Sequence, residues 1–362
     1  MRCFCLSLVV AASASAAPGG ASEVRALWVT RFEYRSEAEV RAILRNSAAL
    51  GFNTILFQVR GQADAYYRSS IEPWADRLGG RDPGFDPLDV ACREAKRLGI
   101  ALHAWVNVMP AWRGKTPPAD RDHVSLKRPD WIVADRQGRR QPFNDHYVCL
   151  NPCLPEVREY IVSVIRDIAA RYPVDGVHLD YVRFIEGDWS YDKKTLALFR
   201  AKTGVFPSRD PEAWDEFRRD AVTETVRMIR QAVKAERPGA LLSAAVFATA
   251  KGRRERFQDA ELWARQGLVD WVMPMTYEDG EGAFESLVSD AERAFRGAAV
   301  LPGVGAYKHE TAEQTVRQLR AARGGFALFS YSSLFVSPDE ARRENEALCR
   351  ARREAVRGFL GK

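Results

Sequence analysis

Short apolar runs alternate with helix-like segments along most of the chain, and this alternation limits the fold more than any other feature. Several runs follow a helix that ends at a glycine, as at Gly51 and Gly99, because glycine readily adopts the conformation of a helix C-cap. Strands that alternate with helices in this way are typical of parallel βαβ units. The predicted strands cover residues 24–32, 53–59, 101–108, 176–184, 241–248, 269–277, 300–307 and 325–331.

Eight such units predict a single (β/α)8 TIM barrel. The chain has 362 residues, which fits either one barrel with insertions or two smaller domains. An open, doubly wound sheet is the alternative, but it normally has a glycine-rich phosphate loop after an early strand, and the sequence has none. Ser36 and Glu39 predict a capping box at the first helix. The predicted helices cover residues 36–50, 87–98, 192–202, 211–236 and 311–322, and the chain from Pro338 onward.

Two of the predicted connections are much longer than the others. Residues 109–155 follow the third strand, and residues 185–238 follow the fourth and include two of the predicted helices. Both leave the carboxyl ends of their strands, which is the face where barrel enzymes build their active sites. We therefore expect these loops to shape a functional cleft.

The N-terminus reads as a targeting segment. Met1-Arg2 is followed by an apolar stretch over 3–12 and by the small residues Ala14-Ser15-Ala16. This pattern predicts a secretory signal peptide over 1–20 and a mature domain over 21–362. The apolar stretch is shorter than the ~20 residues that a spanning helix needs, so we expect a periplasmic or secreted protein with no stable membrane anchor.

Export makes disulfides chemically permissible in the mature chain. Cys149 and Cys153 lie four residues apart in a turn-like segment, and they are a candidate disulfide pair. Cys92 and Cys349 fall in predicted helices, where buried single thiols are expected.

The fourth strand carries the strongest candidate for chemistry. Alternate residues of a strand share a face, so His178 and Asp180 lie on the same side. If that face points inward, Asp180 sits near the top of the barrel, and a buried carboxylate is costly unless it is hydrogen-bonded or used. The structural alternative is a salt bridge to Arg183.

A pair of carboxylates across a cleft is the minimal equipment for glycoside hydrolysis, with one as the acid and the other, here Asp180, as the base or nucleophile. Glu278 and Asp279 follow the sixth strand directly, and Glu278 is the candidate proton donor. The alternative is that these two residues belong to a solvated turn. Asp64, which follows the second strand, is the reserve candidate.

Other strand ends carry aromatic and polar side chains that suit sugars. Aromatic faces stack on sugar rings, and Arg, Asn and Gln donate hydrogen bonds to hydroxyls and carboxylates. Any one of these residues can instead belong to the core, so it is their collection at one end that points to a cleft. The candidate substrate-binding residues are Trp28, Arg31, Gln58, Arg60, Asp64, Tyr66, His103, Trp105, Asn107, His178, Tyr181, Arg183, Tyr277, Asp279, Tyr307 and Tyr331.

Other classes of chemistry are less favoured. His103, His178 and Asp180 are possible metal ligands, but the first strand lacks the His-x-His pair of barrel metallohydrolases, so no metal or other cofactor is predicted. The sequence has no Gly-x-Ser-x-Gly elbow, Walker motif or dinucleotide fingerprint. The formal net charge is +6, but the arginines are dispersed, which disfavours nucleic-acid binding.

Five segments of the chain together resemble the glycosyl hydrolase-like 10 family, and the likeness runs from about Val24 to Phe335. The resemblance implies an exported TIM barrel whose cleft uses Asp180 as the acidic residue of the fourth strand. Some members carry two consecutive acids there, whereas this chain has Tyr181 after Asp180, so Asp180 is the only candidate on that strand. The segments are Arg25–Phe32, Gly51–Arg60, Gly99–Asn107, Leu150–Tyr160 and Val174–Phe184.

The resemblance also implies a function. One characterised type in that family cleaves peptidoglycan glycan strands that have lost their stem peptides. We therefore expect a glycoside hydrolase, acting as a monomer on a cell-wall or other extracellular polysaccharide. The alternatives are a carbohydrate-binding barrel without a complete acid/base pair and, less favoured, a metal-dependent deacetylase or amidase.

Overall fold

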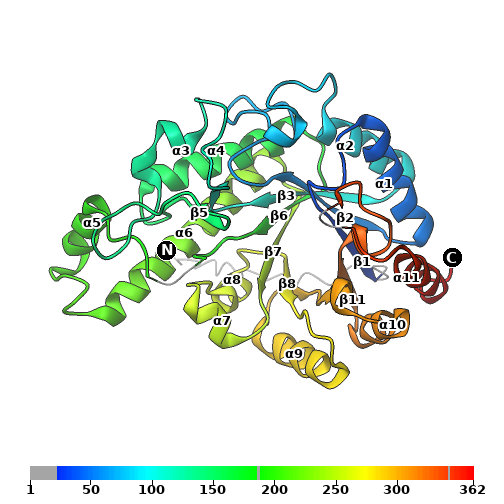
Figure 1. Cartoon of the computed structure of the whole chain (residues 1–362). Coiled ribbons are helices and arrows are strands. Elements are labelled where there is room, and N and C mark those ends of the chain that lie inside the picture. The colour runs from blue at the N-terminus through cyan, green and yellow to red at the C-terminus, as the bar shows by residue number, and fades with distance from the viewer. Residues whose placement is uncertain (1–22, 186–187, 341–342) are drawn as a thin grey trace, which may run out of the picture.

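The computed structural model describes residues 23–185, 188–340 and 343–362, and its centre is a sheet of parallel strands surrounded by helices (Figure 1). The predicted signal peptide lies outside the described residues. Each predicted strand occurs, and most are shorter than expected because the chain turns away at their carboxyl ends. The strands are β1 Val24–Val29, β2 Thr54–Arg60, β3 Ala101–Asn107, β6 Gly176–Asp180, β7 Leu241–Phe247, β8 Trp271–Met275, β9 Ala299–Val300, β10 Gly303–Gly305 and β11 Gly325–Phe329.

The sheet closes on itself through its seventh barrel strand. The strand order is β10-β11-β1-β2-β3-β6-β7-β8-β9, so β9 and β10 form the two edges. These two are neighbouring parts of one run, separated only by residues 301–302. Leu301 N donates to Val272 O at 2.9 Å on one side, and Ala327 N donates to Pro302 O at 3.0 Å on the other. The run therefore joins β8 to β11 and completes the predicted eight-stranded TIM barrel.

The helices pack around the outside of the sheet (Figure 1). The predicted capping box is present at Ser36 and Glu39, and it starts α1. The C-terminal helix begins later than Pro338, because Asn345 provides its N-cap. The larger helices are α1 Glu37–Leu50, α2 Pro87–Leu98, α4 Pro155–Arg171, α5 Lys193–Thr203, α6 Pro211–Glu236, α9 Glu281–Ala294, α10 Ala312–Ala321 and α11 Glu346–Phe359; α7 Ala250–Glu255 and α8 Ala260–Arg265 are short.

The core has two parts, as a barrel requires. A large cluster fills the space between the strands and the helices, and a smaller one fills the barrel interior. Trp28 and Trp105 provide much of the inner cluster, and both are less than 5% exposed. The barrel is therefore filled by side chains, and space for a ligand is left only at its ends.

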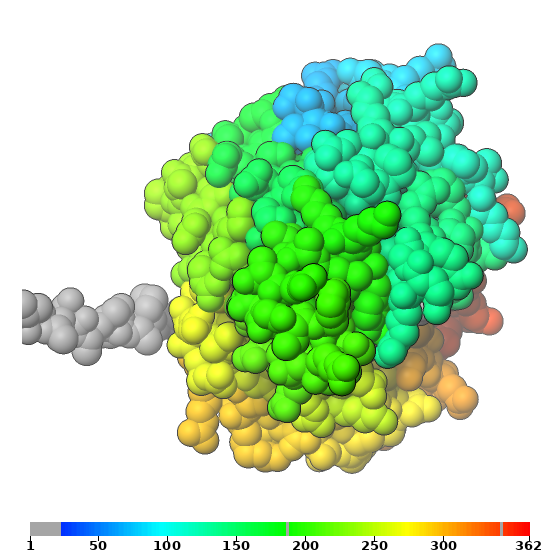
Figure 2. All heavy atoms as spheres, turned by 90° about the vertical axis from the view of Figure 1, so that its left-hand side faces the viewer, coloured from blue at the N-terminus to red at the C-terminus, as the bar shows by residue number. Residues whose placement is uncertain are grey.

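Both long connections lie at the carboxyl ends of the strands, as predicted. The first contains the hairpin of β4 Pro110–Arg113 and β5 Tyr147–Cys149 and the short helix α3 Val124–Lys127, and the second contains α5. The two connections contact each other, because Tyr191 N donates to Ala134 O at 3.1 Å. Figure 2 shows them side by side, in teal and green.

The expected disulfide does not form. Cys149 and Cys153 are buried and are not joined by a disulfide; Cys149 lies within β5, and Cys153 lies near Ser190 in the turn before α4. Cys92 and Cys349 are buried free thiols in α2 and α11, as predicted. Within the described part of the chain, no helix has the length and apolar character to cross a membrane.

Candidate active site

A pocket of about 190 Å³ lies at the carboxyl ends of the barrel strands, and we call it the Asp180 pocket. Its walls come from the ends of β1, β2, β3, β6, β8 and β11 and from the β4–β5 hairpin. Ten of the eighteen catalytic and substrate-binding candidates named from the sequence line this pocket or the hollow beside it. The lining residues are Thr30, Arg31, Phe32, Gln58, Trp105, Asn107, Arg113, Tyr147, Asp180, Tyr181, Arg183, Met275, Tyr277 and Phe329.

Asp180 is the last residue of β6, and it is only 8% exposed. The next residue, Tyr181, has a φ of +50°, so the strand ends there and the chain turns sharply. Within this turn the Tyr181 N–H donates to Asp180 Oδ1 at 2.7 Å. Burial raises the pKa of Asp180, and the nearby Arg183 charge and the Tyr181 N–H oppose this rise. The carboxyl is therefore held in one orientation and keeps its proton to a higher pH than an exposed aspartate.

The floor of the pocket is a fixed network of amides. Gln58 Nε2 and Trp105 Nε1 each donate to Asn107 Oδ1 at 3.1 Å. Asn107 Nδ2 donates to Gly61 O at 3.0 Å, and Gln58 Oε1 accepts from Arg31 N at 3.0 Å. Because each group is locked by its neighbours, the floor is organised before any ligand arrives.

Arginines and aromatic rings form the walls. Arg31 Nη2 donates to Tyr147 Oη at 3.1 Å, and Arg113 Nε donates to the backbone carbonyl of Asp145 at 3.0 Å. Arg183 lies over the Tyr181 ring. Among the described residues, Asp180 and Arg183 form no ion pair, so the structural alternative for Asp180 is not observed. Such walls suit sugar rings and anionic groups.

A second hollow of about 340 Å³ adjoins the pocket and shares Arg31, Phe32 and Arg113 with it. Asp64 and Tyr66 line this hollow. Asp64 Oδ1 accepts from the backbone N–H groups of Gly61 at 3.2 Å and Gln62 at 2.9 Å. The reserve carboxylate is thus rigidly held beside the Asp180 pocket.

Four candidate residues from the barrel strands belong to the interior instead. Trp28 Nε1 donates to His178 Nε2 at 3.0 Å, and His178 Nδ1 lies 2.9 Å from Ser243 Oγ. His103 stacks on Trp271 and is fully buried.

Arg60 is the fourth buried residue, and a register shift between Gln58 and Arg60 sets it beside Val106 of the outer core. Its guanidinium is paired with the Glu72 carboxylate, with 2.8 Å between Nη2 and Oε1. The two-residue period of the strands identified the inward-facing positions of Trp28, His103 and His178, but it could not separate the layer that meets a ligand from the layers below. It also missed the irregularity that turns Arg60 away from the inward face.

The remaining candidates lie at or beyond the rim. Tyr307 is 46% exposed, and its ring contacts Tyr277 and Phe329 at the pocket edge. Tyr331 Oη accepts a hydrogen bond from Asn46. Glu278 and Asp279 are not among the lining residues of the pocket, and the Glu278 carbonyl accepts from Gln318 Nε2 at 2.7 Å on α10.

Sequence reasoning missed the contribution of the β4–β5 hairpin, which supplies Arg113 and Tyr147. The long loop marked the right segment, but the pairing of its two ends depends on tertiary contacts. The lining residues Thr30, Phe32, Met275 and Phe329 were also missed, although each lies within a predicted strand near its carboxyl end.

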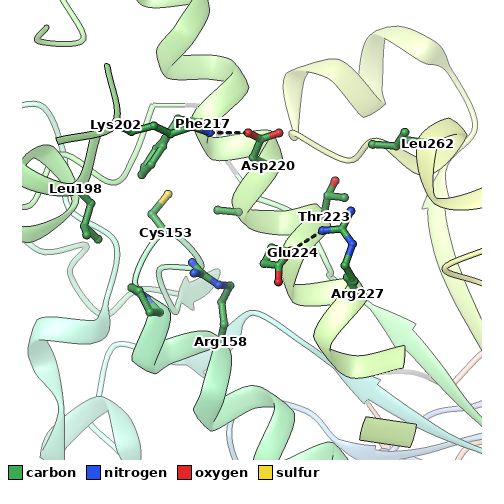
Figure 3. Close-up of a pocket in the computed structure, with 12 residues that line it drawn as sticks. Cys153, Arg158, Leu198, Lys202, Phe217, Asp220, Thr223, Glu224, Arg227 and Leu262 are labelled. Carbon is green, nitrogen blue, oxygen red and sulfur yellow. Dashed lines mark hydrogen bonds and ion pairs between the residues drawn. The ribbon is translucent and has the colours of Figure 1, made fainter. Parts of the chain in front are cut away.

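A larger cavity of about 550 Å³ lies outside the barrel, between α4, α5, α6 and α8. Figure 3 shows that its two acids are paired with neighbouring cations: Lys202 Nζ lies 2.9 Å from Asp220, and Arg227 contacts Glu224. None of its lining residues comes from a barrel strand, and both of its carboxylates are paired with cations, so this cavity offers no unpaired carboxyl.

No group of three or more His, Cys, Asp or Glu side chains that could hold a metal occurs within the described ranges. The possible ligands His103, His178 and Asp180 accordingly do not converge, because both histidines are used in the barrel interior.

Comparison with known proteins identifies the family. The sequence model described as Glycosyl hydrolase-like 10 matches residues 23–301. The chain belongs to this family. The match includes Asp180 and every lining residue of the pocket except Phe329.

Two curated family relatives carry names that refer to hydrolysis. Glycosyl hydrolase YngK of Bacillus subtilis is 26% identical over 291 residues, which cover 70% of this chain and 54% of that protein. Glycosyl hydrolase DigH of Escherichia coli K12 is 28% identical over 250 residues, covering 63% of this chain and 55% of that protein. The chain thus spans about half the length of these relatives.

Solved structures show the same fold. The glycoside hydrolase domain of PgaB (BpsB) from Bordetella bronchiseptica has a TM-score of 0.66 at 14% identity, and the match covers 93% of this chain and 99% of that one. α-L-Fucosidase isoenzyme 2 from Paenibacillus thiaminolyticus has a TM-score of 0.64 at 14% identity, covering 94% and 49%. These neighbours confirm the barrel architecture of this family member.

Proposed function

We propose that the protein is a glycoside hydrolase that cleaves a polysaccharide at the Asp180 pocket. The observation that carries this proposal is a buried carboxyl with a raised pKa at the end of a barrel strand, within a pocket of aromatic and amide side chains. Membership of the glycosyl hydrolase-like 10 family and the names of the two relatives support the same reaction.

The environment of Asp180 suits the general acid. Glycosidic cleavage needs a carboxyl that stays protonated until it donates to the leaving oxygen, and burial favours that form. This differs from the assignment made from sequence, in which Glu278 was the acid and Asp180 the nucleophile or base. Asp64, fixed in the adjoining hollow that shares Arg31, is our proposed second carboxylate, and Glu278 is the alternative.

The substrate that we propose is a bacterial glycan outside the cytoplasm, in particular peptide-free peptidoglycan strands. The predicted signal peptide supports export, and the arginines of the pocket suit a glycan that bears carboxylates.

The test is an incubation of the mature domain, residues 21–362, with peptide-free glycan strands, followed by mass spectrometry of the products. Asp180→Asn should reduce the rate by roughly 10²–10⁴-fold, as expected for loss of a positioned proton donor. Asp290→Asn, on the exposed face of α9, is the matched control and should leave the rate unchanged. Full activity of Asp180→Asn would refute the assignment.

Two further variants separate the candidates for the second carboxylate. Asp64→Asn should remove most activity while Glu278→Gln retains it, and the reverse result would restore Glu278 to that role.

A second candidate function is sugar binding without cleavage. Asp180 is the only carboxylate among the described residues that line its pocket, and a binding module needs no acid/base pair. Glycan binding without products from any glycan tested, under conditions where the fold is intact, would favour this function.

A further inference from the structure

Arg183 is a buried cation for which the described residues provide no side-chain hydrogen-bonding partner. It is only 7% exposed, yet its Nε atom is buried and unpaired, and no ion pair to Arg183 is found among the described residues. A guanidinium stays charged and presents five N–H donors in one plane. Burying such a charge is costly unless a partner supplies acceptors.

Two aromatic rings fix the plane of this guanidinium. Its Cζ lies 4.4 Å from the centroid of the Tyr181 ring and 4.8 Å from that of the Phe247 ring. Contacts of this kind stabilise the charge but use none of the N–H donors, which lie along the edge of the group. The edge of Arg183 is therefore available, and the residue lines the Asp180 pocket.

None of the charged groups described around Arg183 forms an ion pair with its guanidinium. Asp180 is close enough for Arg183 to lower its pKa, but the two form no ion pair within the described structure. The other cations of the pocket, Arg31 and Arg113, donate to a phenol oxygen and to a backbone carbonyl. The pocket thus holds three guanidinium groups against one carboxyl, and burial disfavours the charged form of that carboxyl.

We propose that Arg183 binds a carboxylate carried by the sugar next to the cleaved bond, through paired N–H donors on one edge of the guanidinium. A carboxylate matches the planar fork of an arginine better than any neutral sugar group does. This inference rests on the proposed function, since it names the substrate class of the same pocket. The carboxylate can come from a lactyl ether on an amino sugar or from the C6 position of a uronic acid.

The test measures binding, so it does not depend on turnover. The Asp180→Asn variant is titrated with peptide-free peptidoglycan oligosaccharides and with the same oligosaccharides after chemical reduction of their carboxylates to alcohols. A parallel arm uses a uronic-acid oligosaccharide and its reduced form. We expect the carboxylate form of one of the two sources to bind roughly 10- to 100-fold more tightly than its reduced form.

Substitutions at Arg183 then assign the preference. In the same background, Arg183→Gln should remove it, and Arg183→Lys should keep the charge but lose most of the preference because the planar fork is gone. Arg200→Gln is the matched control, since Arg200 also stacks on a ring, that of Phe206 at 4.8 Å, but lies on α5 away from the pocket. This control should leave the preference intact.

Equal binding of native and reduced glycans in both arms would overturn the proposal, as would a preference that survives Arg183→Gln. Circular dichroism checks that each variant is folded. If Arg183→Gln does not fold, the test rests on Arg183→Lys, which should lose most of the carboxylate preference. A carboxylate preference together with no cleavage by the wild-type protein would instead contradict the hydrolase function and leave the Arg183 site standing.

Discussion

Replacing Glu72 with alanine should lower the free energy of unfolding by about 3–5 kcal/mol, because it leaves the charge of Arg60 buried without its partner. The Arg60 and Glu72 side chains are 2% and 0% exposed. Arg60 Nε donates to both carboxylate oxygens at 2.9 Å, and Tyr160 Oη donates to Oε1 at 2.6 Å. Water cannot replace Glu72 at this depth without opening the end of β2.

The structure also predicts how the effects combine. Arg60→Leu should cost about as much as Glu72→Ala, because each leaves one buried charge unpaired. The double variant Arg60→Leu/Glu72→Leu should cost clearly less than the sum of the two single changes, since it leaves no charge behind. Tyr160→Phe should cost about 1.5–3 kcal/mol, the range for a hydrogen bond to a charged group.

Urea unfolding at pH 7 followed by circular dichroism measures these values, with a constant m-value as the check that the unfolded state is comparable. The reasoning would be refuted if Glu72→Ala cost less than about 1 kcal/mol, or if the single costs added to within about 0.5 kcal/mol. Arg60 would then be a solvated side chain, and its listing among the sugar-binding candidates would regain support.

Three further predictions follow from buried polar groups. Burial lowers the pKa of His103 to about 4. The unfolded chain therefore takes up a proton below about pH 6.5, while the folded protein does not until about pH 4. The free energy of unfolding should therefore fall by about 1.4 kcal/mol for each unit that the pH drops across this range. His103→Phe should flatten this part of the urea-derived profile, and an unchanged slope would contradict the assignment. Burial raises the pKa of Asp180, so the folded state loses stability as the pH rises through that pKa; Asp180→Asn should remove this loss and raise stability at pH 7 by about 0.5–2 kcal/mol in thermal unfolding. Trp28→Phe removes the donor to His178 Nε2 and should cost about 1–3 kcal/mol by urea unfolding, and a neutral effect would show that this hydrogen bond contributes nothing.

The barrel could be predicted because local signals and the global fold agree. Each strand is an apolar run of the right length, and Ser36 and Glu39 mark a helix start that the structure reproduces. Asp180 was found because a carboxylate that ends an otherwise apolar strand is unusual, and the structure places it in the pocket. In each case the signal lies within a few neighbouring residues.

The positions of Arg60 and Glu278 depend instead on residues that are distant in sequence. The partner of Arg60 lies twelve residues away in a loop without regular structure, so the strand pattern alone made Arg60 look like a ligand contact. Glu278 directly follows the predicted strand over 269–277, but the observed strand ends at Met275. Thr276 Oγ1 donates to Gly303 O at 2.8 Å and α10 binds the Glu278 carbonyl, so the chain turns toward the outside. These contacts join segments that are distant in sequence, and no local pattern encodes them.

The hydrogen-bonded chain from Trp28 through His178 to Ser243 joins three strands, β1, β6 and β7, inside the barrel. Arg31 lies three residues after Trp28, and Asp180 lies two residues after His178. The hydrogen bonds of Trp28 and His178 therefore fix the spacing between Asp180 and Arg31 from within the barrel. In evolutionary terms, the loops above are free to lengthen, shorten or diverge without disturbing that spacing.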